Sequence, residues 1–273
     1  MTNKGIMINN NTIQYLSPRE TEVIARLAYE KTSIITKEQL DKYFGFTSAV
    51  RNKIIYRLNK RGILRSISKG IYLYSPLESG PAGSNINEFL IPPVLFPRGN
   101  YYIGYGVMYN YYGFIDQISQ SMDILNTSVQ RQKFINNMNF RMIKIPEKRM
   151  YGLEKIIIGG SEAIISSRER TLVDFIYNPG PAGGIMKAVD ILKYQVKNKK
   201  VNIDKFIKYS ARFPVVSARK IIGFVLEECG ISDKKLYPVI KSVESSSLST
   251  LFGAKSRKGK INNKWKVIID ALA

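Results

Sequence analysis

Residues 36–62 read TKEQLDKYFGFTSAVRNKIIYRLNKRG. Thr36 and Gln39 have the spacing of a capping box, in which two side chains three residues apart satisfy the free amides of a helix start. Gly45 is suited to end that helix, because glycine adopts positive φ without steric cost. A further helix then starts at Thr47 or Ser48. The stretch therefore predicts two consecutive helices joined by a tight turn.

The flanking sequence extends this pair to a winged helix-turn-helix. Ser17 and Glu20 form another capping box, with Pro18 at the first helical position, and predict a helix before the pair. The elements predicted after the turn are a helix running to about Arg61 and ended by Gly62, and strands over Ile63–Ile67 and Ile71–Tyr74 joined by Ser68-Lys69-Gly70. We expect this order to form a winged helix-turn-helix DNA-binding domain over residues 1–80.

The helix that ends near Arg61 has two different faces. At about 100° per residue, Val50, Ile54, Ile55 and Leu58 share one side and are expected to pack on the two earlier helices. The candidate DNA-contacting residues of this helix are Ser48, Ala49, Asn52, Lys53, Tyr56, Arg57 and Lys60. Asparagine can bond adenine through two hydrogen bonds, while lysine and arginine reach guanine or phosphate. An ordinary solvated helix face is the alternative.

Three further basic residues lie on this helix or on the hairpin that follows it. Arg51 leans toward the apolar side and is the least suited to read bases. On the hairpin, Arg65 and Lys69 are candidates to contact the DNA backbone or the minor groove. A plain turn is the alternative there.

The composition excludes several chemistries. Among 273 residues there is no histidine and one cysteine, Cys229. A Ser-His-Asp triad, a Cys-His pair and a histidine-ligated zinc are therefore excluded, and so are an internal disulfide and a cysteine-ligated cluster. Cys229 lies at an apolar helix end, where burial is expected rather than reactivity. We expect no cofactor and no metal.

Phosphate-loop and nuclease motifs are absent as well. Gly253 to Lys260 has five residues between its glycines and Ile261 after the lysine, which is not a nucleotide-binding loop. A metal-dependent nuclease needs an acidic-x-Lys pair on a strand, and the only such triplet, Asp233-Lys234-Lys235, starts a polar helix. We therefore expect no catalytic centre.

The charge indicates a polyanionic partner. The chain has 42 Lys and Arg against 21 Asp and Glu, a net charge of +21. Residues 1–75 carry +8, residues 76–140 carry −1 and residues 141–273 carry +14. Nucleic acid is the first candidate and anionic lipid a distant second. A coding bias toward lysine is the alternative, although such a bias would also have raised the charge of the middle segment.

The uncharged middle segment is aromatic. Eleven Phe and Tyr lie between Phe89 and Phe140, which suggests a buried seam between two basic parts. The tyrosines from Tyr101 to Tyr112 can also stack on bases, but their spacing and the lack of charge favour a core or seam.

Two basic clusters follow in the C-terminal half. The first comprises Lys197, Lys199, Lys200, Lys205 and Lys208. The second, here called the C-terminal basic patch, comprises Lys255, Arg257, Lys258, Lys260 and Lys264, with Lys266 beside it. We hypothesise that these clusters extend a DNA footprint. Solvated loops are the alternative.

A linker, Pro76–Ser84, rich in Pro, Gly and Ser, leads into a larger mixed α/β domain expected over residues 81–273. A strand and an aromatic helix are predicted over Tyr101–Gly113. Further strands are predicted over Met122–Asn126, Phe140–Ile145, Leu153–Ile158, Ala163–Ile165 and near Trp265–Ile269. A helix opened by a capping box of Ser166 and Glu169 follows, and the other predicted helices span Gly184–Val196, Ile203–Ala211, Ser217–Cys229 and Asp233–Val243. On the capped helix, Arg170 and Asp174 are four residues apart. An internal ion pair is favoured there over a partner contact.

Several segments of this domain resemble the AbiEi antitoxin family. They are Tyr101-Tyr102-Ile103-Gly104-Tyr105, Tyr112-Gly113-Phe114-Ile115-Asp116-Gln117, Glu169-Arg170-Thr171-Leu172-Val173-Asp174, Gly183-Gly184-Ile185 and the stretch Ser247–Trp265. The N-terminal winged helix also lies where those proteins have theirs. One departure is Tyr112, which stands where the family pattern has a histidine.

The resemblance implies an antitoxin of a two-gene, type IV toxin–antitoxin system associated with abortive phage infection. By this resemblance, the winged helix binds double-stranded DNA at repeats upstream of the shared operon and represses it. The C-terminal domain counteracts a nucleotidyltransferase-like toxin encoded by the adjacent gene, without a stable complex.

Two other classes of function stay open from the sequence. One is a winged-helix repressor whose second domain senses a ligand or dimerises, with no toxin partner. The other is a nucleic-acid-processing enzyme.

The N-terminal residues, Met1–Gln14, have no apolar signal-peptide region, and no apolar run approaches the roughly 18 residues of a membrane span. We therefore expect a cytoplasmic protein without a membrane partner.

Overall fold

The computed structural model of the chain describes residues 16–75, 87–117, 119–135, 138–158, 161–253 and 257–270. The chain is of the mixed α/β class and divides into two compact units, Met1–Ile86 and Asn87–Ala273. The predicted linker, Pro76–Ser84, lies outside the described residues.

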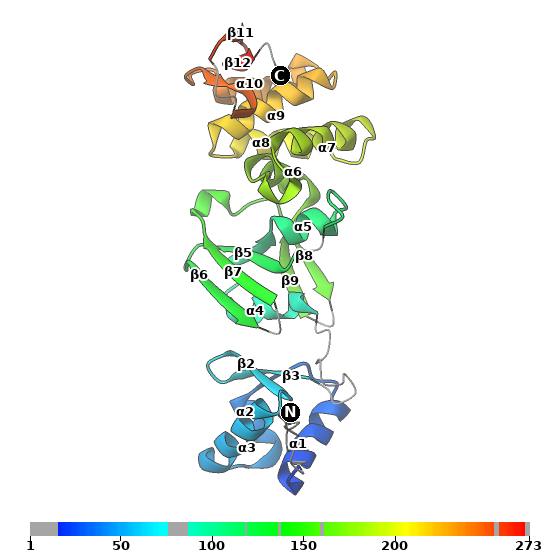
Figure 1. Cartoon of the computed structure of the whole chain (residues 1–273), viewed down its shortest axis with the longest axis vertical. Helices are drawn as coiled ribbons and strands as arrows, with labels where there is room; N and C mark the ends of the chain where they lie inside the picture. Colours follow the sequence, from blue (N-terminus) through cyan, green and yellow to red (C-terminus); the bar gives the residue numbers. More distant parts are fainter. Residues whose placement is uncertain are drawn as a thin grey trace, which may run out of the picture. The chain divides into compact units, whose positions relative to one another are not determined.

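In the first unit, residues 16–75 form three helices around a small antiparallel sheet (Figure 1). The elements are α1 (Pro18–Tyr29), β1 (Ile34–Thr36), α2 (Lys37–Phe44), α3 (Ser48–Lys60), β2 (Leu64–Ser68) and β3 (Ile71–Tyr74). The strand order is β1-β3-β2. Strand β1 was not predicted, because its three residues are defined by pairing with β3 rather than by a local pattern.

The local signals that position these helices act as predicted. Both capping boxes form, with Ser17 and Glu20 at α1 and with Thr36 and Gln39 at α2. Gly45 ends α2 at φ +60°. Thr47, rather than Ser48, caps α3. The apolar sides of the three helices and the sheet then enclose one core, which includes Val23, Leu27, Ile35, Leu40, Ile54, Leu58 and Leu64.

The second unit is built on a six-stranded mixed sheet. Its strands are β4 (Tyr101–Gly104), β5 (Ser121–Asn126), β6 (Arg131–Ile135), β7 (Met138–Lys144), β8 (Leu153–Ile158) and β9 (Ser161–Ser166). Their order is β6-β7-β5-β4-β9-β8, with parallel pairs at β7/β5 and β4/β9. Strand β6 was not predicted, because four of its five residues are polar or exposed.

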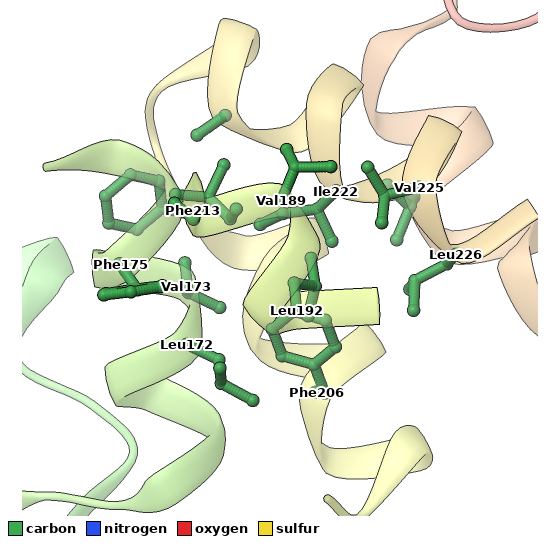
Figure 2. Close-up of a cluster of buried hydrophobic side chains, with 14 of the residues drawn as sticks. Leu172, Val173, Phe175, Val189, Leu192, Phe206, Phe213, Ile222, Val225 and Leu226 are labelled. Carbon is green, nitrogen blue, oxygen red and sulfur yellow. The ribbon is translucent and has the colours of Figure 1, made fainter. Parts of the chain in front are cut away.

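The helices of the second unit are α4 (Ile91–Leu95), α5 (Gly106–Tyr111), α6 (Arg168–Tyr177), α7 (Ile185–Lys197), α8 (Ile203–Arg212), α9 (Val216–Glu228) and α10 (Asp233–Val243), with single 3-10 turns at Glu88–Leu90, Glu147–Arg149, Gly180–Ala182 and Leu251–Gly253. Helices α4, α5 and α6 contact the sheet, whereas α7 to α10 pack on α6 and on one another. Tyr102 faces the core shared with α6 to α9, whereas Tyr101 stacks on Phe96 at the end of α4, on the opposite face. Figure 2 shows the helical part of this core, with Leu172 and Phe175 of α6 beside Leu192 of α7 and Phe206 of α8.

A small third sheet ends the chain. It has the order β10-β12-β11, from β10 (Ser249–Thr250), β11 (Gly259–Asn262) and β12 (Val267–Asp270). The strand expected from Trp265 starts two residues later. Trp265 itself lies in the preceding turn and is fully buried against Gly223 of α9.

Two expectations are corrected in the second unit. The helix α6 is capped by Ser167, whose Oγ accepts the amide of Arg170, and not by a capping box of Ser166 and Glu169. Ser166 is the last residue of β9, and Glu169 instead accepts the amide of Asn202 at 3.0 Å. In the aromatic segment, Tyr102, Tyr105, Tyr109 and Phe114 lie in the core of the second unit, one of the two placements expected, whereas Tyr111 and Phe134 are exposed against that expectation.

Candidate nucleic-acid interface

Helix α3 separates its apolar and polar residues cleanly. Ile54, Ile55 and Leu58 are buried in the core of the first unit. Asn52, Lys53 and Tyr56 are exposed on the other side, and Tyr56 keeps 68% of its surface. A mostly exposed tyrosine has a ring on which a base can stack, and the neighbouring amide and cation have the chemistry to bond a base edge and a phosphate.

A shallow open groove runs along this face. It is lined by Asn52, Ile55, Tyr56, Asn59, Lys60 and, from strand β3, Tyr72. Asn59 was not singled out from the sequence, although it follows Tyr56 by three residues and so shares its face. Burial raises the pKa of Tyr72, so its hydroxyl stays neutral and can donate a hydrogen bond at the end of the groove.

The predicted residues at the two ends of α3 differ in their exposure and in whether a carboxylate lies near their charge. Ser48 and Ala49 are exposed in the first turn of the helix. Lys60 is exposed at its other end. Arg57 keeps 46% of its side-chain surface and lies 4.0 Å from a carboxylate oxygen of Glu20, so part of its charge is already balanced.

Arg51 has a structural role, in line with its low rank as a base reader. Its guanidinium is paired with Asp41 of α2, and only 15% of its side chain is exposed. The pair links α2 to α3, whose apolar sides also share the core of the first unit.

The hairpin places its two candidates differently. Lys69 is exposed in the turn between β2 and β3, next to Gly70 at φ +77°. Arg65 is half-buried on β2, opposite Leu73 in the sheet register. Lys69 is therefore the better placed of the two for a contact with a nucleic-acid backbone.

The C-terminal basic patch is only partly available. Arg257, Lys258 and Lys260 are exposed before and within β11, whereas Lys255 lies outside the described residues. Lys264 does not fit the prediction, because its Nζ donates to Glu227 at 2.6 Å and is also paired with Asp233. Its charge is balanced by two carboxylates that hold the turn between β11 and β12 to α9 and α10.

The earlier lysine cluster is exposed. Its members are Lys197, Lys199, Lys200, Lys205 and Lys208. Lys200 has an aromatic partner, since its Nζ lies 4.7 Å from the ring centre of Tyr194 and donates to that hydroxyl. The cluster lies at the end of α7 and along α8.

The segments that carry the family resemblance lie largely in the interior. Arg170 and Asp174 are fully buried and 2.5 Å apart, as the ion-pair interpretation requires. Tyr112 donates its hydroxyl to the carbonyl of Ser166 at 2.9 Å. Gly183 and Gly184 adopt φ +88° and +110° in the turn before α7. These contacts order the second unit around its sheet.

Among the residues that the structure describes, no three or more Asp, Glu or Cys side chains are grouped so that they could hold a metal ion. Nor does the described part of the chain contain a helix with the length and apolar character needed to cross a membrane.

Comparison with known proteins identifies a fold. No protein-family model matches the sequence, and no curated protein matches it. Among solved structures, the chain is similar to the RV2827C protein from Mycobacterium tuberculosis, with a TM-score of 0.65 and 14% sequence identity. The similarity covers 93% of this chain and 92% of that one. The mixed α/β architecture is thus common to both over almost their whole length.

Proposed function

We propose that the chain is a DNA-binding antitoxin that represses its own operon and has no catalytic centre. The first unit would act as a winged helix-turn-helix, with α3 in the major groove and the β2–β3 hairpin as the wing. The observation that carries the proposal is the exposed face of α3, where Asn52, Lys53 and Tyr56 are exposed while Ile54, Ile55 and Leu58 on the opposite face are buried.

The charge supports a DNA ligand over a protein ligand. Residues 1–75 carry a net charge of +8, and Lys53, Lys60 and Lys69 are exposed on the helix and the hairpin. Such a distribution attracts the phosphates of a duplex and makes binding salt-dependent. The partner proposed here is double-stranded DNA at repeats in the chain's own promoter.

The antitoxin activity is assigned to the second unit on the resemblance of its motifs. By that resemblance it counteracts a nucleotidyltransferase-like toxin from the adjacent gene, in the cytoplasm and without a stable complex. Growth of cells induced for the neighbouring gene, with and without this chain, tests the assignment. Arrest that the chain relieves, even when residues 1–80 are deleted, is the expected result. A neighbour that does not arrest growth contradicts it.

A second candidate is a winged-helix repressor whose second unit senses a ligand or dimerises, with no toxin partner. An open pocket in the second unit, lined in part by Arg131, Arg141 and Tyr177, favours a sensor over dimerisation alone. The same growth experiment separates the two, because a sensor-repressor needs no toxic neighbour.

A further inference from the structure

A pocket of about 510 Å³ opens in the second unit beside strands β6 and β7. Gln132 and Arg141 lie opposite each other on these strands, and Arg131 starts β6. The rest of the polar lining comes from Tyr177 and Asn178 at the end of α6 and from Tyr105 before α5. This volume is in the range of roughly 300–1,000 Å³ that small-molecule sites occupy.

The charge around the pocket is positive. Arg141 donates to both oxygens of Asp123, at 2.6 and 2.7 Å, and still exposes 40% of its side chain. Arg131 is exposed. Behind the lining, Arg149 and Arg170 share the single carboxylate of Asp174. These described residues thus carry four guanidinium groups and two carboxylates. An anion bound in the pocket would balance the excess positive charge.

Tyr177 offers an aromatic surface at the same place. Tyr177 keeps 38% of its surface exposed, and the guanidinium of Arg149 lies 4.7 Å from its ring centre. Phe213 holds the ring in an edge contact at 5.2 Å. A tyrosine fixed in this way can stack on a nucleobase. The neighbouring amide of Asn178 has the donor and acceptor that a base edge needs.

Tyr105 contributes a hydroxyl whose position is imposed by the fold. Its backbone has φ +52° and ψ −134°, a rare conformation for a bulky residue, and such conformations gather at functional sites. Its Oη accepts from Nη2 of Arg149 at 2.8 Å. Burial raises the pKa of Tyr105, so the hydroxyl keeps its own proton for donation to a ligand.

We propose that this pocket binds a nucleoside phosphate, with the phosphate against Arg131 and Arg141 and the base against Tyr177 and Asn178. The proposal does not depend on DNA binding by the first unit or on a toxin. The pocket would recognise the phosphate and the base of one small-molecule ligand at the same time.

Isothermal titration of the full chain with AMP, GMP, CMP and UMP tests the proposal. Adenosine and inorganic phosphate serve as separate arms, because each carries only half of the proposed contacts. At least one nucleotide is expected to bind, and each half-ligand more weakly by tenfold or more, as a rough guide from one lost charge-assisted hydrogen bond. Absence of binding by all four nucleotides at millimolar concentration overturns the proposal.

Substitutions then test where the nucleotide binds. Arg131→Gln and Tyr177→Leu are each expected to weaken binding about tenfold. Lys208→Gln removes the same charge from an exposed position on α8 and is expected to leave binding unchanged. Lys53→Gln, on α3, tests whether the nucleotide binds to the first unit instead, and it is expected to leave the affinity unchanged. Circular dichroism confirms that each variant folds. Equal affinity in wild type and in both pocket variants, or loss in Lys53→Gln alone, overturns the proposal.

Discussion

Arg170 and Asp174 form an ion pair of 2.5 Å, one helical turn apart on α6, and neither side chain has any exposed surface. Arg149 reaches the same carboxylate oxygen from the turn after β7, at 3.3 Å. The three residues join the sheet to the helical part of the second unit. One carboxylate therefore balances two buried cations, and its loss would leave both without a counter-charge.

Asp174→Asn should be among the most destabilising single changes in the second unit. Removing one partner of a buried ion pair costs about 3–5 kcal/mol, since the remaining charge stays desolvated. Urea unfolding, followed by circular dichroism, should show a lower midpoint. Glu162→Gln is the matched control, because it breaks an exposed pair with Lys155 and should cost less than about 1 kcal/mol. Equal losses in the two variants would contradict the buried role.

Gly223→Ala tests the close packing at the end of the chain. A Cβ at this position of α9 would lie 2.0 Å from Cζ3 of Trp265, which is fully buried. Overpacking of this kind typically costs about 1–3 kcal/mol. Trp265 is the single tryptophan of the chain, so a shift of its emission to longer wavelength reports its displacement directly. Gly180→Ala, where a Cβ meets nothing within 4 Å, should leave both stability and emission unchanged.

Glu20 should make the stability of the first unit depend on pH. Burial opposes ionisation of its carboxyl, but hydrogen bonds from Ser17 and the charge of Arg61 outweigh it and hold the pKa below the ordinary 4.5. The folded state therefore gains stability above the ordinary pKa and loses it as the pH falls through the lowered one. Glu20→Gln should be less stable at pH 7 and less sensitive to acid. Glu22→Gln, at an exposed position of the same helix, should behave like the wild type.

The unfolding of the two units can be followed by different signals. Circular dichroism reports both units, whereas Trp265 emission reports only the second. Glu20→Gln should move the urea transition seen by circular dichroism and leave the emission transition in place. Movement of both transitions together would refute the assignment of the effect to the first unit.

The elements with short-range signals could be predicted, and those defined by pairing could not. Ser17, Thr36 and Gly45 act within one turn of the chain, so their helix ends are visible in the sequence. Strand β6, by contrast, is a polar edge strand that exists through its partner β7. The choice of Ser167 over Ser166 as a cap depends on where β9 ends, which is a matter of sheet register.

The candidate sites divide in the same way. The polar face of α3 follows from helical spacing alone, and Asn52 and Tyr56 lie where that spacing places them. Lys264 could not be judged from charge, because its partners, Glu227 and Asp233, are more than 30 residues away. The pocket of Arg131, Arg141 and Tyr177 likewise comes from separate segments that only the fold brings together.

Substitutions on α3 should separate base reading from phosphate binding. Asn52→Ala should cost about 1–3 kcal/mol of affinity for promoter DNA and relax preference at one base position. Lys53→Gln should weaken binding to all sequences and lower the salt slope by about one. Fluorescence anisotropy with the promoter duplex and single-base variants of it measures both effects. Arg19→Gln on α1, an exposed position outside this face, is the control and should change neither.

The C-terminal basic patch should affect DNA binding through salt dependence if it extends the footprint. Replacing Arg257, Lys258 and Lys260 by Gln should lower the slope of log affinity against log salt by up to about 0.9 for each residue that contacts a phosphate. Lys144, Lys148 and Lys187 are exposed at other positions of the second unit, so their triple Gln variant matches the change in net charge. A slope that falls in the patch variant alone places DNA at β11. A slope unchanged in both variants would confine the footprint to the first unit and leave the patch as a solvated surface.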